Sequence, residues 1–243
     1  MPISPVIPDW PAPGLVKAMV TTRTGGRSNG SFASLNLGLR SGDVSALVEQ
    51  NRRRLAVMLP SPPCWLDQVH GSHVIPWSAS APLDPADGVY SHTRHQVCAV
   101  LSADCLPLLL CHRDGGWVAA VHCGWRGLSA GIIEQAISRL ETAGTNILAW
   151  LGPAIGPRVY EVGEEVYQAF VSQHAVDSEA FQICRPGHWL ADLYQLARNR
   201  LRRSGVDAVY GGTFCTYTER SRFYSYRRNP HCGRMASLIW LEE

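Results

Sequence analysis

The sequence predicts an α/β fold, built as a single domain around mixed sheets. Segments with the apolar character of strands alternate along the chain with segments of helical periodicity, which is the pattern of an α/β protein. The length of 243 residues suits one large domain, and no repeat, low-complexity tract or linker divides the chain. Hydrophobic residues make up 46% and charged residues 17%, so the chain can bury a sizeable core and is not intrinsically disordered.

Strands are predicted where apolar and β-branched residues lie between turn-forming residues. In chain order these segments are Leu15–Thr22, Val74–Trp77, Val97–Ser102, Leu106–His112, Trp117–His122, Ile147–Leu151, Ala208–Gly211, Phe223–Tyr226 and Ala236–Leu241.

Helices are predicted where apolar residues recur every three or four positions. These segments are Val44–Leu59, Leu128–Ala143, Glu164–Gln173 and Ala191–Ser204. The second of them places Ile132, Ile133, Ala136, Ile137 and Leu140 on one face.

Charge and cysteine usage exclude several classes of function. The net charge is only +2, which favours neither a nucleic-acid nor a membrane partner. The 8 cysteines include no CxxC pair, so we expect reduced thiols in a reducing compartment. No apolar run approaches the ~20 residues that cross a bilayer, and the first residues lack the pattern of a secretory signal. The expected location is the cytoplasm.

Three segments place a reactive side chain at the end of a predicted strand, where ligand crevices form in α/β proteins. They are residues 65–71, 102–107 and 119–127, and they carry His70, Cys105 and His122. Two imidazoles and one thiolate would give zinc three ligands and leave a fourth position for water or substrate.

A metal-free alternative uses the same residues. Cys105 could be a nucleophile and His122 its base, with Asp104 orienting the histidine. Residue types and spacing alone leave both interpretations open.

The turn from Gly124 to Gly127 leads from a strand into the predicted helix. The unpaired N–H groups of a helix start favour an anion, and Arg126 would add a charged donor suited to phosphate. A tight turn with Trp125 packed as a lid is the structural alternative. The loops that hold Arg23 and Asn36 are candidates for substrate contacts or for ordinary turn chemistry.

Read in order, a set of motifs along the chain resembles one family. The motifs are TTRTGG, SLNLG, LDQVHG, SADCLPLLL, VHCGWRG, LGPAIGPRVYEVG, FCTYTE, FYSYRRN and GRMASLIWL. They resemble the multicopper polyphenol oxidase or laccase-domain family, whose members have been reassigned as zinc-dependent purine nucleoside phosphorylases. The resemblance extends from about Val16 to Leu241.

The resemblance implies both a fold and an activity. The fold would be one domain, residues 1–243, layered α-β-β-α and remotely similar to a cysteine-hydrolase toxin. The activity would be phosphorolysis of adenosine, inosine, guanosine and methylthioadenosine, with adenosine deamination in the same pocket. A second family role is cell-wall editing, in which precursors that carry serine on UDP-N-acetylmuramate are removed.

The resemblance also assigns site residues. His70, Cys105 and His122 fall on the family's metal ligands and are the expected catalytic residues. Zinc is the expected metal; copper suits the site less well, because none of the 9 histidines forms a His-x-His pair. Residues expected to bind nucleoside or phosphate are Arg23, Asn36, Gln68, Asp104 and Arg126, and Gln68, Asp104 and Tyr160 are the acid–base candidates.

Three positions depart from the family's usual residues. They are Arg40, Cys123 and Cys232, and Cys123 adds a thiol next to His122 that could perturb the metal. The expected partners are a purine nucleoside and phosphate. The sequence does not determine the oligomeric state, and a monomer is compatible with it. A protein that binds zinc or a nucleotide without turnover is the third hypothesis.

Overall fold

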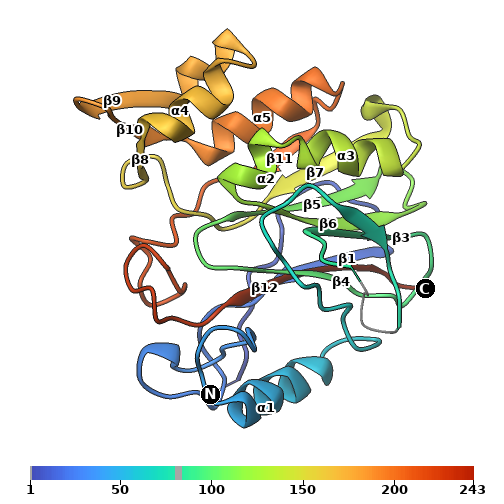
Figure 1. Cartoon of the computed structure of the whole chain (residues 1–243). Coiled ribbons are helices and arrows are strands. Elements are labelled where there is room, and N and C mark those ends of the chain that lie inside the picture. The colour runs from blue at the N-terminus through green and yellow to red at the C-terminus, as the bar shows by residue number, and fades with distance from the viewer. Residues whose placement is uncertain (1, 80–83) are drawn as a thin grey trace.

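The most apolar strands of the chain pair at the centre of a six-stranded sheet in the computed structural model, which describes residues 2–79 and 84–243. The strand order is β11-β7-β5-β6-β3-β2 (Figure 1). Their bounds are β2 Val74–Pro76, β3 Gly88–Ser91, β5 Leu106–His112, β6 Val118–Cys123, β7 Ile147–Leu151 and β11 Val209–Gly211. The outer pairs β11–β7 and β2–β3 are parallel and the inner pairs are antiparallel, so the sheet is mixed, as predicted.

A second, antiparallel sheet packs face to face on the first. It has the order β1-β12-β4, with β1 at Val16–Val20, β4 at Cys98–Ser102 and β12 at Met235–Leu241. Because side chains alternate along a strand, Val100, Leu109 and Ile239 meet between the sheets. The opposite face of β12 presents Leu238 and Trp240 to the cluster that includes Leu55 of α1 (Ser45–Ala56).

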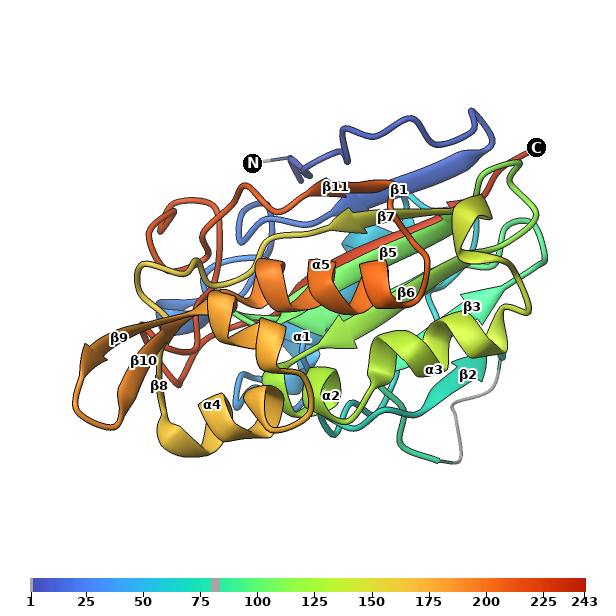
Figure 2. The ribbon, with the colours of Figure 1, turned by 90° about the horizontal axis from the view of Figure 1, so that it is seen from above.

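Helices α2 (Trp125–Ser129), α3 (Ile132–Arg139) and α5 (Leu193–Arg203) cover the other face of the six-stranded sheet (Figure 2). The four layers α-β-β-α are therefore those that the family resemblance implied. A small sheet, β8-β10-β9, lies beside α4 (Glu164–Val171) at one end of the molecule. Its strands are β8 Glu161–Gly163, β9 Phe181–Arg185 and β10 His188–Ala191.

Several sequence predictions require correction. The predicted helix 128–143 is two helices, because Gly131 adopts a φ of 84° that interrupts the ladder, and the first of them begins at Trp125. Residues 223–226 form no strand; Ser225 instead donates its hydroxyl hydrogen to Asp104 at 3.0 Å. Strand β3 and the β9–β10 hairpin were not predicted.

Across the described parts of the chain, no helix has both the length and the apolarity needed to cross a membrane.

Candidate metal centre and its cavity

Strand pairing in the six-stranded sheet brings Cys105 next to His122. Leu106 pairs with Cys123 and Pro107 with His122, so the residue just before β5 lies beside the end of β6. Alternation along β6 sends the His122 side chain away from Cys123, which packs in the core beneath the helices. Burial raises the pKa of the Cys123 thiol well above its ordinary value, so this thiol is neutral and faces away from the centre.

Asp87, which sequence analysis missed, holds the two histidines in place. Its fully buried carboxylate accepts a hydrogen bond from His122 Nδ1 at 2.8 Å. It also accepts the backbone N–H groups of Val69, His70 and Gly71 at 3.1, 3.0 and 2.7 Å. These bonds fix the loop in which His70 takes a φ of 62°. The sequence signal was weak, because an aspartate followed by a glycine is also typical of a turn.

The three side chains form a group that could hold a metal ion. One ligand atom from each of His70, Cys105 and His122 lies within 4.8 Å of the others, and the two imidazole rings meet edge to face. The donor set fits zinc, because a thiolate and two imidazoles are its usual protein ligands. The second-sphere contact fits too, since ligating histidines donate their other ring N–H to a carboxylate, as His122 does to Asp87.

Electrostatics favour the ionised thiol that a metal ligand requires. Burial opposes ionisation of Cys105, but His122 and His70 outweigh it and lower the thiol pKa to about 6. Burial likewise opposes a charge on His122, but Cys105 and Asp87 raise its pKa to about 9. The Asp87 pKa is below its ordinary value, since the bonds from His122 and the loop N–H groups outweigh the effect of burial. A metal-free protein near neutral pH therefore holds a thiolate beside an imidazolium.

The two glycines of the 124–127 turn lie in close contact with other parts of the chain. A Cβ at Gly124 would lie 3.0 Å from His70 Cδ2 and 3.1 Å from Cys105 Sγ. A Cβ at Gly127 would lie 2.7 Å from the carbonyl oxygen of Gly71. The turn thus packs directly on two of the three candidate ligands and on the loop between them.

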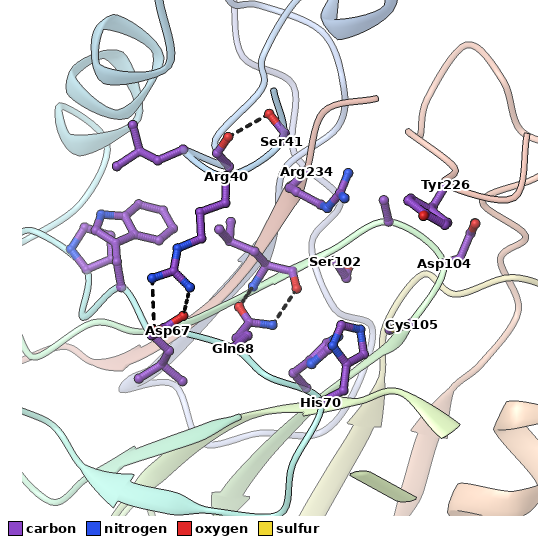
Figure 3. A pocket seen from close by; sticks show the side chains of 18 of the residues that line it. Arg40, Ser41, Asp67, Gln68, His70, Ser102, Asp104, Cys105, Tyr226 and Arg234 are labelled. Atoms are coloured by element: carbon purple, nitrogen blue, oxygen red, sulfur yellow. Dashed lines mark hydrogen bonds and ion pairs between the residues drawn. The ribbon is translucent and has the colours of Figure 1, made fainter. Parts of the chain in front are cut away.

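The group opens into a cavity of about 1050 Å³ (Figure 3). Gln68 lines it and is bonded to the backbone of Leu101 on β4. Its amide nitrogen donates to the Leu101 carbonyl at 2.8 Å, and its amide oxygen accepts from the Leu101 N–H at 2.7 Å. Arg126 also lines the cavity, with its guanidinium carbon 4.5 Å from the centre of the Trp125 ring. The Gln68 amide is therefore already bonded to β4, whereas the Arg126 guanidinium is open to a ligand; the binding role of Gln68 stays a prediction.

The other predicted binding residues have structural contacts. Asp104 lines the cavity, but its carboxylate accepts bonds from Thr216, Ser225 and the Arg227 N–H. Arg23 and Asn36 are not among the residues that line it. Arg23 donates to the carbonyls of Ala33 and Arg220, and buried Asn36 bridges its own loop to Arg234. Their roles in substrate binding remain predictions.

Comparison with known proteins places the chain in a family. A purine nucleoside phosphorylase of Pseudomonas aeruginosa is 52% identical over 237 residues, covering 97% of this chain and 98% of that protein. The purine nucleoside phosphorylase YfiH of Escherichia coli is 52% identical over 243 residues, with the same coverage. A crystal structure of a Neisseria meningitidis protein superposes with a TM-score of 0.94 at 44% identity, covering 98% of this chain and 99% of that one.

YlmD from Geobacillus stearothermophilus superposes with a TM-score of 0.87 at 33% identity, covering 95% of this chain and 93% of that one. The family described as multi-copper polyphenol oxidoreductase laccase matches residues 17–242. By this match and by its relatives, the chain belongs to the multi-copper polyphenol oxidoreductase laccase family.

Proposed function

We propose that this protein is a zinc-dependent purine nucleoside phosphorylase acting on adenosine, inosine, guanosine and methylthioadenosine, with adenosine deaminase activity in the same cavity. The observation that carries the proposal is the group of His70, Cys105 and His122 at a cavity large enough for a nucleoside and phosphate. The relatives named purine nucleoside phosphorylase support it. The proposed compartment is the cytoplasm, and the proposed partners are these small molecules.

His70, Cys105 and His122 would hold the zinc ion, which when bound supplies a Lewis acid. Asp87 fixes the tautomer of His122 by accepting a hydrogen bond from its Nδ1–H, so that Nε2 is left as the ligand atom. Zinc is preferred to copper because the described residues offer one thiolate and two imidazoles and the sequence has no His-x-His pair.

Phosphorolysis forms a bond between a phosphate oxygen and the anomeric carbon while the glycosidic C–N bond breaks. The products are the free purine, which takes up a proton, and ribose 1-phosphate. The protein must hold both reactants in line and exclude water as the competing nucleophile. Deamination of adenosine would exchange the purine amino group for the oxygen of water and release ammonia and inosine.

The test is incubation of the zinc-loaded protein with adenosine, with and without phosphate, followed by chromatographic separation of the products. Adenine formed only with phosphate is the expected sign of phosphorolysis, and inosine in both samples is the expected sign of deamination. Both products should disappear in His122→Ala. Absence of adenine in the wild-type sample with phosphate would contradict the phosphorylase proposal.

A second candidate is a Cys105-dependent hydrolase or amidase that edits serine-containing UDP-N-acetylmuramate precursors. The specific observation in its favour is the hydrogen-bonded series from Asp87 through His122 to Cys105, whose thiol pKa is lowered to about 6. Asp87 takes the orienting position that sequence analysis gave to Asp104, because the carboxylate of Asp104 is bonded to residues 216, 225 and 227.

Metal removal separates the two candidates. A hydrolase of this kind would retain activity after zinc is chelated, would not depend on phosphate, and would be lost in Cys105→Ser. The phosphorylase would be lost on chelation and restored by added zinc. Tight binding of zinc or nucleoside with no product from either substrate would instead favour the third hypothesis, a binding protein without turnover.

A further inference from the structure

The cavity has a strong excess of positive charge. Its lining includes five arginines, Arg40, Arg52, Arg126, Arg227 and Arg234. The only acidic residues among the described lining residues are Asp67, paired with Arg40, and Asp104, which already accepts three hydrogen bonds. A ligand with at least one anionic group fits such a lining better than a neutral nucleoside alone.

Three of the five arginines have contacts that keep them at the cavity wall. Arg40 is paired with Asp67, Arg52 stacks on Trp65 and donates to a loop carbonyl, and Arg234 donates to carbonyls of its own turn. Of the remaining two, Arg126 lies at the start of α2 and Arg227 lies in the long loop between β11 and β12.

Arg126 and Arg227 have donors to spare. The guanidinium of Arg126 stacks on Trp125 and has no hydrogen-bond acceptor among residues 2–79 and 84–243. Arg227 uses one terminal nitrogen to donate to the Glu161 carbonyl at 2.8 Å, and its backbone N–H is fixed by Asp104 at 2.7 Å. Its Nε and second terminal nitrogen have no acceptor in the described part of the chain.

Tyr160 lines the same cavity as these arginines and the candidate metal centre. The Arg227 guanidinium carbon is 5.3 Å from the centre of the Tyr160 ring. Burial and the nearby Cys105 raise the tyrosine pKa, while Arg227 and Arg126 oppose them, so all four groups share one environment. Within the described ranges the tyrosine hydroxyl has no hydrogen-bond partner, and it is protonated and able to donate.

We propose that Arg126, Tyr160 and Arg227 form the phosphate site next to His70, Cys105 and His122, and that Arg227 selects phosphate over water as the nucleophile. This inference rests on the proposed phosphorylase function and assigns Arg227 and Tyr160 to it. Two guanidinium groups and one hydroxyl offer the charged and neutral donors that phosphate oxygens accept. The Arg227 backbone bond to Asp104 fixes the position from which that side chain reaches the cavity.

The test compares the zinc-loaded wild type with Arg227→Gln, Arg227→Lys and Tyr160→Phe. Arg158→Gln is the matched control, because Arg158 lines a separate cavity in the same part of the chain as Tyr160. Inorganic phosphate is titrated in two ways: as the rise in thermal unfolding temperature, and as the KM for phosphate in adenosine phosphorolysis. Circular dichroism confirms that each variant is folded.

We expect Arg227→Gln to lose most of the stabilisation by phosphate and to raise the KM for phosphate by about tenfold to a hundredfold, the loss of a charged hydrogen bond. The effect on the KM for phosphate should exceed the effect on the KM for adenosine. Arg227→Lys should recover part of the phosphate affinity, and Tyr160→Phe should show a smaller loss of it.

An Arg227→Gln variant with the phosphate KM and phosphate stabilisation of the wild type would overturn the site, whereas Arg158→Gln should match the wild type throughout. If the wild type is stabilised by phosphate but forms no adenine, the phosphorylase proposal fails, and the variants still test the phosphate site by stabilisation alone. A wild type that phosphate does not stabilise would overturn the site.

Discussion

Asp87 accepts two sets of hydrogen bonds, one from a histidine ring and one from a loop backbone. It accepts from His122 Nδ1 and from three consecutive backbone N–H groups of the loop that carries His70. Four donors converge on two oxygens, so the charge is well compensated despite full burial. One residue therefore couples the orientation of one candidate ligand to the loop conformation of another.

Asp87→Asn tests this coupling. The amide keeps one acceptor oxygen but turns an NH₂ group toward donors, so we expect zinc affinity to fall by about tenfold to a hundredfold. The affinity is measured by competition with a chromophoric chelator. Asp114→Asn, an exposed aspartate in the loop after β5, should bind zinc like the wild type. Unchanged affinity in Asp87→Asn would show that the carboxylate does not support the metal ligands.

The reactivity of Cys105 gives a prediction for the metal-free protein. Because the folded pKa of about 6 lies below that of an ordinary thiol, the thiolate is present above pH 6 and is lost as the pH falls through that value. The rate of alkylation by iodoacetamide, followed by mass spectrometry of the Cys105 peptide, should have its midpoint near pH 6. His122→Ala should move the midpoint upward, since it removes the imidazolium.

Cys184 is the internal reference in this experiment, because it is an exposed thiol that does not belong to the candidate metal centre. Equal midpoints for Cys105 and Cys184 would contradict the assignment of a thiolate and imidazolium pair. Zinc added before the reagent should protect Cys105 and leave Cys184 reactive.

At the scale of elements, the turn between β6 and α2 connects the core strand to the candidate ligands. It is tight because Gly124 faces His70 and Cys105 and Gly127 faces the Gly71 carbonyl. These contacts join residues about 20 and 55 positions apart, so they explain two glycines that sequence analysis could interpret only as turn residues.

Gly124→Ala is expected to weaken zinc binding by about tenfold with little loss of stability. The added methyl group would press on His70 Cδ2 and Cys105 Sγ, which must move by a few tenths of an ångström to accommodate it. Chelator competition measures the affinity, and urea unfolding of the metal-free protein measures stability. Gly14→Ala is the control, because nothing lies within 4 Å of a Cβ at that position. Wild-type affinity in Gly124→Ala would contradict this account of the turn.

The elements also show how much of the fold the sequence could predict. Strands β5 and β6 were predictable because a continuous apolar run, such as Leu106–His112, is typical of a strand that is buried on both faces. The 128–143 segment has unbroken apolar periodicity, which predicts one helix. Gly131 nevertheless ends the first helix with a left-handed backbone conformation, which the spacing of apolar residues does not reveal. Segment 223–226 has the composition of a strand, but the hydrogen bond of Ser225 to Asp104 holds it in a loop.

The same distinction applies to the candidate site. His70, Cys105 and His122 could be proposed because each follows or ends an apolar strand and has a side chain suited to metals. Asp87 could not, because its partners lie 16 to 18 and 35 residues away and its local sequence is that of a turn. Strand register decides these contacts, and register is a property of the whole sheet.

At the scale of the whole molecule, the cavity lies where distant parts of the chain meet. Its lining combines the ends of β4 and β6 with the loop that carries His70 and the C-terminal segment that contains Tyr226 and Arg227. Asp104 attaches that segment to the sheet: its carboxylate accepts from Thr216 and Ser225, 112 and 121 residues away, and from the Arg227 N–H. One aspartate therefore attaches three positions of this segment, beside backbone bonds such as that from the Thr216 N–H to the Ala154 carbonyl.

Asp104→Asn should loosen the attachment of residues 213–228 to the sheet while leaving the candidate metal centre in place. Asparagine tolerates the positive φ of 94° at this position, so the change tests the hydrogen bonds rather than the backbone. We expect a loss of about 1–3 kcal/mol in the free energy of unfolding, because buried donors lose an acceptor.

Hydrogen exchange should accelerate in residues 213–228 and stay unchanged in residues 65–71, which Asp87 and Gln68 hold. Zinc affinity should fall less than in Asp87→Asn, and the KM for phosphate should rise because Arg227 loses its fixed backbone. Unchanged exchange in residues 213–228 would show that other contacts, such as the backbone bonds of Thr216 with Ala154 and of Arg222 with Arg23, suffice to hold the segment.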